Sequence, residues 1–204
     1  MSRDHRIVVP DLPHHITQRG NGRQEVFIDD EDRRCYLNWL RIEGKASGVT
    51  FLAFCLMTNH VHLVAIPAHE LSLAIGIGRA QWGYSRAFHR RHGKSGALWQ
   101  ARFFSCPMDE PHMYQAIRYV ELNPVRCGMA KEAGQYAWSS AAEHLGQSNG
   151  PRVLELAKLG DQWGHENWSE YLHGPCEEDR NAIRLNTCRG LRWESAPDAS
   201  ATQV

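Results

Sequence analysis

The chain has 204 residues and a mass of 23.2 kDa, which suits one domain with a small extension. Hydrophobic residues make up 42% and charged residues 23%, so the composition is that of a globular protein able to bury a core. Basic and acidic residues balance at 23 each with a pI of about 7.2, which argues against a uniformly basic nucleic-acid-binding protein.

The predicted elements alternate between strands and helices over the first two thirds of the chain. Turn residues and acidic helix starts mark their boundaries, and the period of the apolar residues gives their type. The expected order is a strand over 14–19, a helix from the acidic run 29–32 to about 46, a strand over 49–57, a tight turn at 58–59, a strand over 60–66, a helix over 71–91, a strand over 97–106, and a helix that Asp109 caps and Pro124 ends.

The first six of these elements follow a β-α-β-β-α-β order. This order matches the split βαβ, ferredoxin-like arrangement, an α+β fold in which an antiparallel sheet carries its helices on one face. We therefore expect a main domain over residues 1–145. A C-terminal extension over residues 146–204 is expected to be partly helical or disordered, because clear periodicity is lost there.

Several classes of protein are disfavoured. The mean hydropathy is −0.51 and no apolar stretch approaches the roughly 18 residues of a membrane span, so no membrane partner is expected. The N-terminal residues lack the apolar region of a signal peptide, which favours a cytoplasmic location. Six scattered cysteines without a C-x-x-C pair disfavour a zinc ribbon or a disulfide framework.

The charge is unevenly distributed. Residues 76–104 carry six basic and no acidic side chains, whereas residues 132–179 carry nine acidic and two basic ones. Local basic density is what a phosphate backbone meets, so a neutral total does not exclude a nucleic-acid partner.

Two histidines stand in the predicted strand over 60–66. Side chains alternate across a strand, so His60 and His62 point to the same face and could converge on one divalent ion. An exposed histidine pair would give the same pattern. Its place in an otherwise apolar segment weighs against that alternative, because unpaired buried polar groups are costly.

A tyrosine stands on the last predicted helix. Gln115, Tyr119 and Asn123 are spaced four residues apart, on a different face from the apolar positions 113, 117 and 120. A tyrosine on such a polar face can act as a nucleophile toward phosphorus, and Asn123 could supply an oxygen ligand to the same metal. Most helix tyrosines, however, are packing residues.

Five short segments in order make the chain resemble the HUH single-strand transposases, and within them the REP-associated tyrosine transposases. The match covers about residues 6–145, and the segments are 6–21, Met57-Thr58-Asn59-His60-Val61-His62-Leu63, Leu98-Trp99-Gln100-Ala101-Arg102-Phe103, 119–126 and Trp138-Ser139-Ser140. A stretch near the C-terminus, 186–190, is faintly similar to a motif of relatives but departs from it at Cys188.

The resemblance implies an HUH-endonuclease fold and a transposase that nicks and joins single-stranded DNA through a 5′-phosphotyrosine. It implies that Tyr119 is the nucleophile and that His60, His62 and Asn123 ligate a divalent metal, Mg²⁺ or Mn²⁺. Imidazole ligands suit Mn²⁺ better than Mg²⁺. The implied partner is a single-stranded hairpin from palindromic (REP-like) repeats.

Arginine and aromatic residues together favour single-strand binding. The alternative is that Trp82 and Phe88 are core residues and the arginines form a solvated face, and for the two aromatics we expect the core position. The candidate DNA contacts are Arg19, Arg79, Arg86, Arg90, Arg102 and Arg126.

Two alternatives remain open at this stage. One is a domesticated hairpin-binding protein of the same fold that cleaves weakly or not at all. The other is a metallohydrolase that uses a zinc-bound water and forms no covalent adduct. A monomer is slightly favoured over a homodimer, because the long tail could cover the edge of the sheet.

Overall fold

The computed structural model describes residues 7–147, 165–174, 180–189 and 192–193. Its centre is a four-stranded sheet in the order β2-β3-β1-β4, and every pair of neighbours is antiparallel. The strands are β1 (His14–Arg19), β2 (Val49–Met57), β3 (His60–Pro67) and β4 (Phe104–Pro107). This strand order is that of the ferredoxin-like split βαβ unit, so the predicted α+β class is confirmed.

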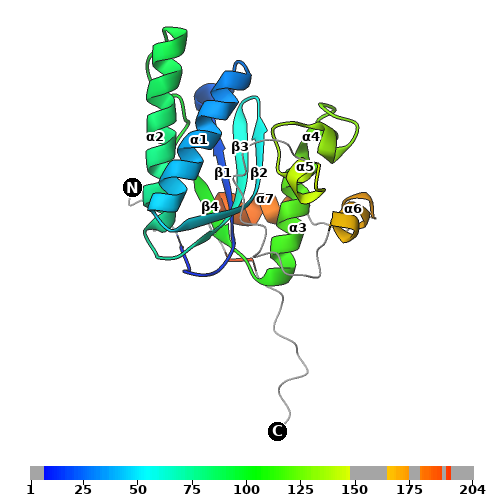
Figure 1. Ribbon diagram of the computed structural model, residues 1–204. Coiled ribbons are helices and arrows are strands. Elements are labelled where there is room, and N and C mark those ends of the chain that lie inside the picture. The colour runs from blue at the N-terminus through cyan, green and yellow to red at the C-terminus, as the bar shows by residue number, and fades with distance from the viewer. Residues whose placement is uncertain (1–6, 148–164, 175–179, 190–191, 194–204) are drawn as a thin grey trace.

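Helices cover both faces of this sheet (Figure 1). The helices of the split βαβ unit, α1 (Asp30–Ala46) and α2 (Ser72–His92), share one face, as predicted, and pack on Ile16, Leu56 and Leu63. Helix α3 (Glu110–Glu121) follows that unit and packs on the other face, against Cys55 and Val64. The sequence prediction of helices on one face concerned the split βαβ unit alone, and α3, which follows that unit, covers the second face. Both faces of β2 and β3 are apolar, and each needs a cover.

The shorter elements follow the tyrosine helix or join the strands. A break at Leu122 separates α3 from α4, which begins at the Asn123-Pro124 step. The remaining elements are η1 (Asn21–Arg23), α4 (Asn123–Arg126), η2 (Ala133–Gln135), α5 (Ala141–His144), α6 (His165–His173) and α7 (Arg180–Arg189).

Helices α1 and α2 approach each other closely. A side chain at Gly83 of α2 would place its Cβ 2.8 Å from the indole ring of Trp39 on α1, so only glycine fits this contact. Helix α2 ends at Gly93, whose φ of 60° is the left-handed conformation that glycine adopts without strain. The paired helices thus form one rigid layer behind the sheet.

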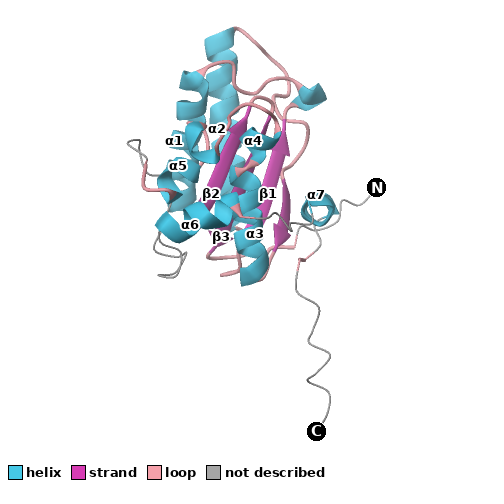
Figure 2. Ribbon diagram, turned by 90° about the vertical axis from the view of Figure 1, so that its right-hand side faces the viewer, coloured by secondary structure: helices cyan, strands magenta, loops and turns pink. Residues whose placement is uncertain are grey.

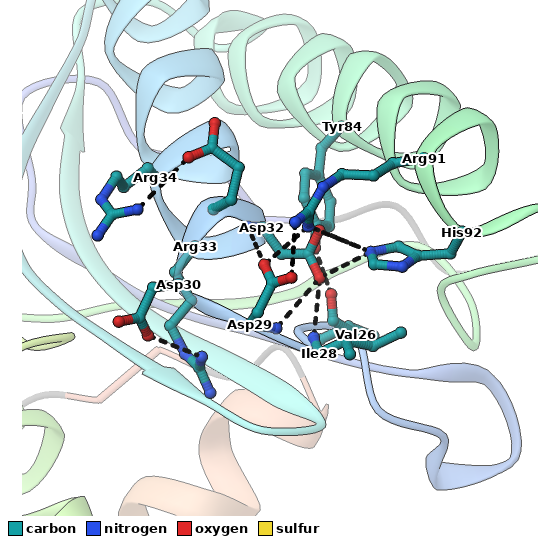
Figure 3. A network of polar contacts seen from close by, with 11 residues as sticks. Val26, Ile28, Asp29, Asp30, Asp32, Arg33, Arg34, Tyr84, Arg91 and His92 are labelled. Carbon is teal, nitrogen blue, oxygen red and sulfur yellow. Dashed lines mark hydrogen bonds and ion pairs between the residues drawn. The ribbon is translucent and has the colours of Figure 1, made fainter.

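A buried aspartate joins the start of α1 to the end of α2 (Figure 3). Asp32 is 2% exposed and accepts hydrogen bonds from the backbone N–H of Ile28, from the guanidinium of Arg91 at 2.7 Å and from His92 at 2.9 Å. Burial alone would raise the pKa of Asp32, but the hydrogen bonds from His92, Ile28 and Arg91 outweigh it and hold the pKa below its usual range. This clamp fixes the loop 24–29.

The loop 24–29, which Asp32 holds, packs on the tight turn at residues 58–59 that precedes His60. The backbone N–H of Val26 donates to the carbonyl of Thr58 at 2.9 Å, and the Tyr84 hydroxyl of α2 donates to the carbonyl of Val26. The carbonyl of Asn59 accepts from the N–H of Gly20 at 2.9 Å. Side chains of the α1–α2 layer therefore hold the loop, and the loop holds the turn before β3 through main-chain hydrogen bonds.

Chain segments pair with the outer strands β2 and β4. On the β2 side, the N–H of Leu56 donates to the carbonyl of Trp138 and the N–H of Ser140 donates to the carbonyl of Phe54. On the β4 side, the N–H of Trp193 donates to the carbonyl of Pro107 at 2.9 Å. Both outer strands thus have main-chain partners beyond the sheet.

Two sequence predictions can be compared with these observations. Of the strand expected over 97–106, only the last part forms a strand, as β4. The first part lies beside the turn at Gly20 and pairs there only through an isolated bridge between Gly20 and Trp99. In the C-terminal extension, the described side chains Trp168, Leu172, Ile183 and Trp193 are buried in the same core as α3. The expected disorder from Ser195 onward lies outside the described residues.

No helix among the described residues is both long enough and apolar enough to cross a membrane.

Substituting Asp32 with asparagine is expected to lower the free energy of unfolding by about 1–3 kcal/mol at neutral pH, because a buried charged acceptor is lost. The folded pKa is depressed, so this contribution is present above the ordinary value of 3.8 and disappears as the pH falls through the folded pKa. Urea unfolding of both proteins across an acid pH series measures the difference. The exposed Asp30, changed to asparagine, is the matched control, and an equal loss in both variants would contradict the clamp.

Candidate functional site

A cavity of about 620 Å³ lies on the α3 side of the sheet. Strands β1, β3 and β4, the α3–α4 junction and α7 all contribute to its wall. The lining side chains that matter below are His15, Arg19, His60, His62, Arg102, Phe104, Tyr119, Asn123 and Thr187. The structure thus brings together the predicted tyrosine, both predicted histidines and the predicted asparagine.

The two histidines of β3 face this cavity from the same side of the strand. Their ring centroids are 5.1 Å apart and the rings are nearly perpendicular. Asn59 donates from Nδ2 to the carbonyl of Arg23 at 3.2 Å, which turns its Oδ1 toward His60 Nδ1 at 2.7 Å. An amide oxygen only accepts, so His60 Nδ1 carries the proton and Nε2 carries the lone pair. The turn before β3 therefore sets the tautomer of His60.

A third histidine, which sequence reasoning missed, lies beside this pair. The ring of His15 on β1 is parallel to that of His62, with a centroid distance of 5.3 Å, and its Nε2 is 3.1 Å from His62 Nδ1. Its other nitrogen, Nδ1, is 2.7 Å from the hydroxyl of Thr187 on α7. Burial lowers the pKa of His15 to about 4, so the ring is neutral at neutral pH.

Tyr119 lies at the centre of these contacts. The prediction placed it on a polar helix face, but the side chain is 1% exposed and packs into the core below the cavity. Its ring meets the rings of His62 and His15 edge-on, at centroid distances of 5.6 Å and 5.9 Å. The tyrosine ring is thus enclosed by the histidines.

The end of the tyrosine helix is held by two side chains of α4. Asn123 donates from Nδ2 to the carbonyl of Tyr119 at 3.0 Å, so its Oδ1 is the amide atom able to ligate a cation. Arg126 donates to the same carbonyl, and its guanidinium lies 4.6 Å from the centroid of the Tyr119 ring. Such a contact between a cation and an aromatic face is attractive. Both side chains therefore orient Tyr119.

A buried carboxylate holds the opposite side of the same helix. Glu121 is fully buried and accepts from the Ser140 hydroxyl at 2.5 Å, from His144 Nδ1 at 2.5 Å and from the Trp168 indole N–H at 2.8 Å. Burial alone would lower the pKa of His144, but the charge and hydrogen bond of Glu121 raise it above its ordinary value. The Trp-Ser-Ser segment thereby connects the outer strand β2 to the tyrosine helix.

The predicted DNA contacts do not form one surface. Arg19 and Arg102 line the cavity, and Arg126 contacts Tyr119 next to it. Three others, Arg79, Arg86 and Arg90, are exposed on α2, behind the opposite face of the sheet. Their role in DNA binding stays a prediction.

The aromatics of α2 divide into two groups. Tyr84 and Phe88 are core residues, whereas Trp82 is 61% exposed and the guanidinium of Arg86 lies 4.7 Å from its ring. The expected core position is therefore confirmed for Phe88 and wrong for Trp82.

Within the described residues, no group of three or more His, Cys, Asp and Glu side chains is placed to hold a metal ion. A divalent ion bound by the histidine pair would therefore need an oxygen ligand from a residue type other than His, Cys, Asp or Glu. Asn123 is the side chain of the predicted set that offers one.

The profile of the family described as "Transposase IS200 like" matches residues 8–123, which is more than half of the chain. The chain therefore belongs to the IS200-like transposase family. The matched residues include His60, His62, Tyr119 and Asn123. A search of curated proteins gives no match.

Two solved structures are similar to this chain, and the first of them shares its fold. One, described as a REP-associated tyrosine transposase bound to a REP hairpin, is 14% identical with a TM-score of 0.58, and the alignment covers 79% of this chain and 94% of that one. Another, a putative transposase from Deinococcus radiodurans R1, is 19% identical with a TM-score of 0.42 and coverages of 59% and 96%. The likeness to the first agrees in fold with the resemblance that the sequence motifs indicated.

The raised pKa of His144 predicts a pH dependence of stability. Its ion pair with Glu121 contributes fully below the ordinary value of 6.5 and is lost as the pH rises through the folded pKa. The free energy of unfolding of the wild type should therefore exceed that of His144→Gln most at mildly acidic pH. Chemical unfolding over a pH series measures the difference, and a difference that grows toward alkaline pH would refute this assignment.

Proposed function

We propose that this transposase is a metal-dependent enzyme that nicks and rejoins single-stranded DNA through a tyrosine. The observation that carries the proposal is that Tyr119 lines one cavity with His60 and His62, and that its ring meets the ring of His62 edge-on. A packing tyrosine has no need of a histidine pair or of an asparagine that holds its own carbonyl. This arrangement is what a positioned nucleophile requires.

The donor set suits a divalent ion. His60 offers Nε2, His62 lies next to it, and Asn123 offers Oδ1. Two imidazoles and one amide oxygen leave room for phosphate oxygens, and they fit Mn²⁺ better than Mg²⁺. A bound ion would supply Lewis-acid stabilisation of the charge that develops on the scissile phosphate.

In the proposed reaction, Tyr119 Oη attacks the phosphorus in line with the leaving oxygen. The new bond is a 5′-phosphotyrosine, the bond to the 3′ oxygen breaks, and that oxygen takes up a proton while the phenol loses one. A 3′-hydroxyl can reverse this step by attacking the phosphotyrosine, so the strands are rejoined without another energy source. Arg126 and Asn123 keep the ring in place through the carbonyl of residue 119.

The proposed substrate is a DNA hairpin with a single-stranded flank. Arg19 and Arg102 bring positive charge to the cavity, and Phe104, which is 45% exposed at its wall, offers a surface on which a base can stack. The structure with a similar fold is described with a REP hairpin bound, which supports this class of ligand. The cytoplasmic location stays a prediction.

The decisive variant is Tyr119→Phe. It should form no covalent adduct and should lose nicking of a labelled hairpin in Mn²⁺, because the nucleophilic oxygen is gone. Tyr114→Phe on the same helix is the matched control and should form adduct like the wild type. A denaturing gel of protein with single-stranded hairpin DNA shows the adduct.

Further outcomes separate the competing functions. His60→Ala and His62→Ala should abolish cleavage while hairpin binding, measured by fluorescence anisotropy, is largely kept. Hairpin binding without any nicking by the wild type would favour a domesticated binding protein. Cleavage by Tyr119→Phe without an adduct would favour a metal-bound water as the nucleophile.

The pairing of the two outer strands supports a monomer. An exposed edge is where strands of two chains would pair, but Trp138 and Ser140 occupy main-chain groups in the last part of β2, and Trp193 occupies the carbonyl at the end of β4. Light scattering coupled to size-exclusion chromatography should give the mass of one chain over a wide concentration range. A stable dimer at the lowest concentration would contradict this inference.

A further inference from the structure

A line of hydrogen bonds runs from α7 to the histidine pair. It begins at Thr187, passes through His15 and ends at His62. Thr187 and His15 are 172 positions apart in the chain, and His15 and His62 are 47 positions apart. His15 and Thr187 are each 1% exposed and His62 is 7% exposed, so bulk water cannot substitute for these partners. Helix α7 contacts β4 and β1, and Figure 2 shows it beside the sheet on the side of β1. The contact between His15 and Thr187 lies at this junction.

The direction of this line follows from the chemistry of its first member. The Thr187 hydroxyl lies 2.7 Å from the carbonyl of Ile183, and a carbonyl oxygen can only accept. The single hydroxyl proton therefore goes to Ile183. The oxygen of Thr187 is then the acceptor for His15, so His15 Nδ1 must carry a proton.

The next two members follow in turn. The hydrogen-bond partners of His15 are a hydroxyl and an imidazole, neither of which compensates a buried positive charge, so the ring is neutral and carries a single proton. With that proton on Nδ1, His15 Nε2 is an acceptor, and His62 Nδ1 must donate to it. The lone pair of His62 is thereby assigned to Nε2.

We propose that Thr187 and His15 are positioning residues that hold His62 in the tautomer and ring orientation needed to ligate the catalytic divalent ion. The inference rests on the proposed function, because it assigns His62 as a ligand. It adds that helix α7, in the C-terminal extension, is part of the metal site. His60 is set independently by Asn59, so the two proposed ligands are oriented by different segments of the chain.

A direct measurement on the metal-free wild type tests the direction of the hydrogen bonds from Thr187 through His15 to His62. Nitrogen-15 spectra of histidine-labelled protein, with His62 assigned from a His62→Gln variant, distinguish protonated from unprotonated ring nitrogens. We expect His62 with the proton on Nδ1. A proton on Nε2 would overturn the proposal without any substitution at Thr187.

Substitution of Thr187 tests its consequence for metal binding. Thr187→Val has nearly the same shape but no acceptor, and the affinity for Mn²⁺ should fall about 10–100-fold, the usual effect of losing a partner of a ligating histidine. Thr187→Ser keeps the hydroxyl and should restore the affinity. Calorimetric titration with Mn²⁺ measures both, and thermal melting confirms that α7 stays folded.

The matched control is Ser85→Ala. Ser85 on α2 also donates to the carbonyl four residues earlier, at 2.7 Å, but on the far face of the sheet, so its loss should leave Mn²⁺ binding unchanged. If His62→Ala loses Mn²⁺ binding and Thr187→Val does not, Thr187 does not position His62 for the metal, and the proposed function stands. If the wild type shows no His62-dependent Mn²⁺ binding, the proposed metal role fails. The nitrogen-15 spectrum then still tests whether Thr187 and His15 set the tautomer of His62.

Discussion

The buried carboxylate of Glu121 is the constraint on which the geometry of the site depends. An ionised carboxylate removed from water is tolerated only when its oxygens are satisfied, and here they accept from α5, α6 and the segment that borders β2. Glu121 and Tyr119 are two positions apart, about 200° around the helix, so fixing one side of α3 fixes the direction of the other. The Trp-Ser-Ser segment is therefore more than a sheet border, since Ser140 joins β2 and Glu121 at once.

The opposite wall of the cavity is positioned by different contacts that converge on β3. The Asp32 clamp holds the loop 24–29, this loop holds the turn at Thr58, and Asn59 in that turn sets the ring of His60. The ring of His62 is set from β1 and α7. The two histidines therefore have separate hydrogen-bond partners, so a change at one of these contacts acts directly on only one of the two rings.

The sequence predicts most of the local arrangement and little of the long-range one. Alternation along β3 is enough to place His60 and His62 on one face, and the acidic start and the proline end are enough to predict the tyrosine helix. The burial of Tyr119 could not be read from helix periodicity, because both sides of α3 are covered by segments far away in the chain. His15 carried a weak signal, as a histidine within a predicted strand. Its partner Thr187 stands in the stretch 186–190 that is faintly similar to a motif of relatives, but nothing local to residues 180–189 indicates that this helix lies on β1.

The basic residues between 76 and 104 do not gather at the cavity. Of the six basic residues between 76 and 104, Arg91 is neutralised by Asp29 and Asp32, and Arg79, Arg86 and Arg90 stand behind the sheet. The cations near Tyr119 are Arg19, Arg102 and Arg126, which come from three separate segments. Binding at the cavity therefore cannot draw on the whole basic segment. Under the proposed function, few cations stand beside Tyr119, so we expect the salt dependence of DNA binding at the cavity to reflect a small number of phosphate contacts. We then expect selectivity to come from the shape of the DNA and from its bases.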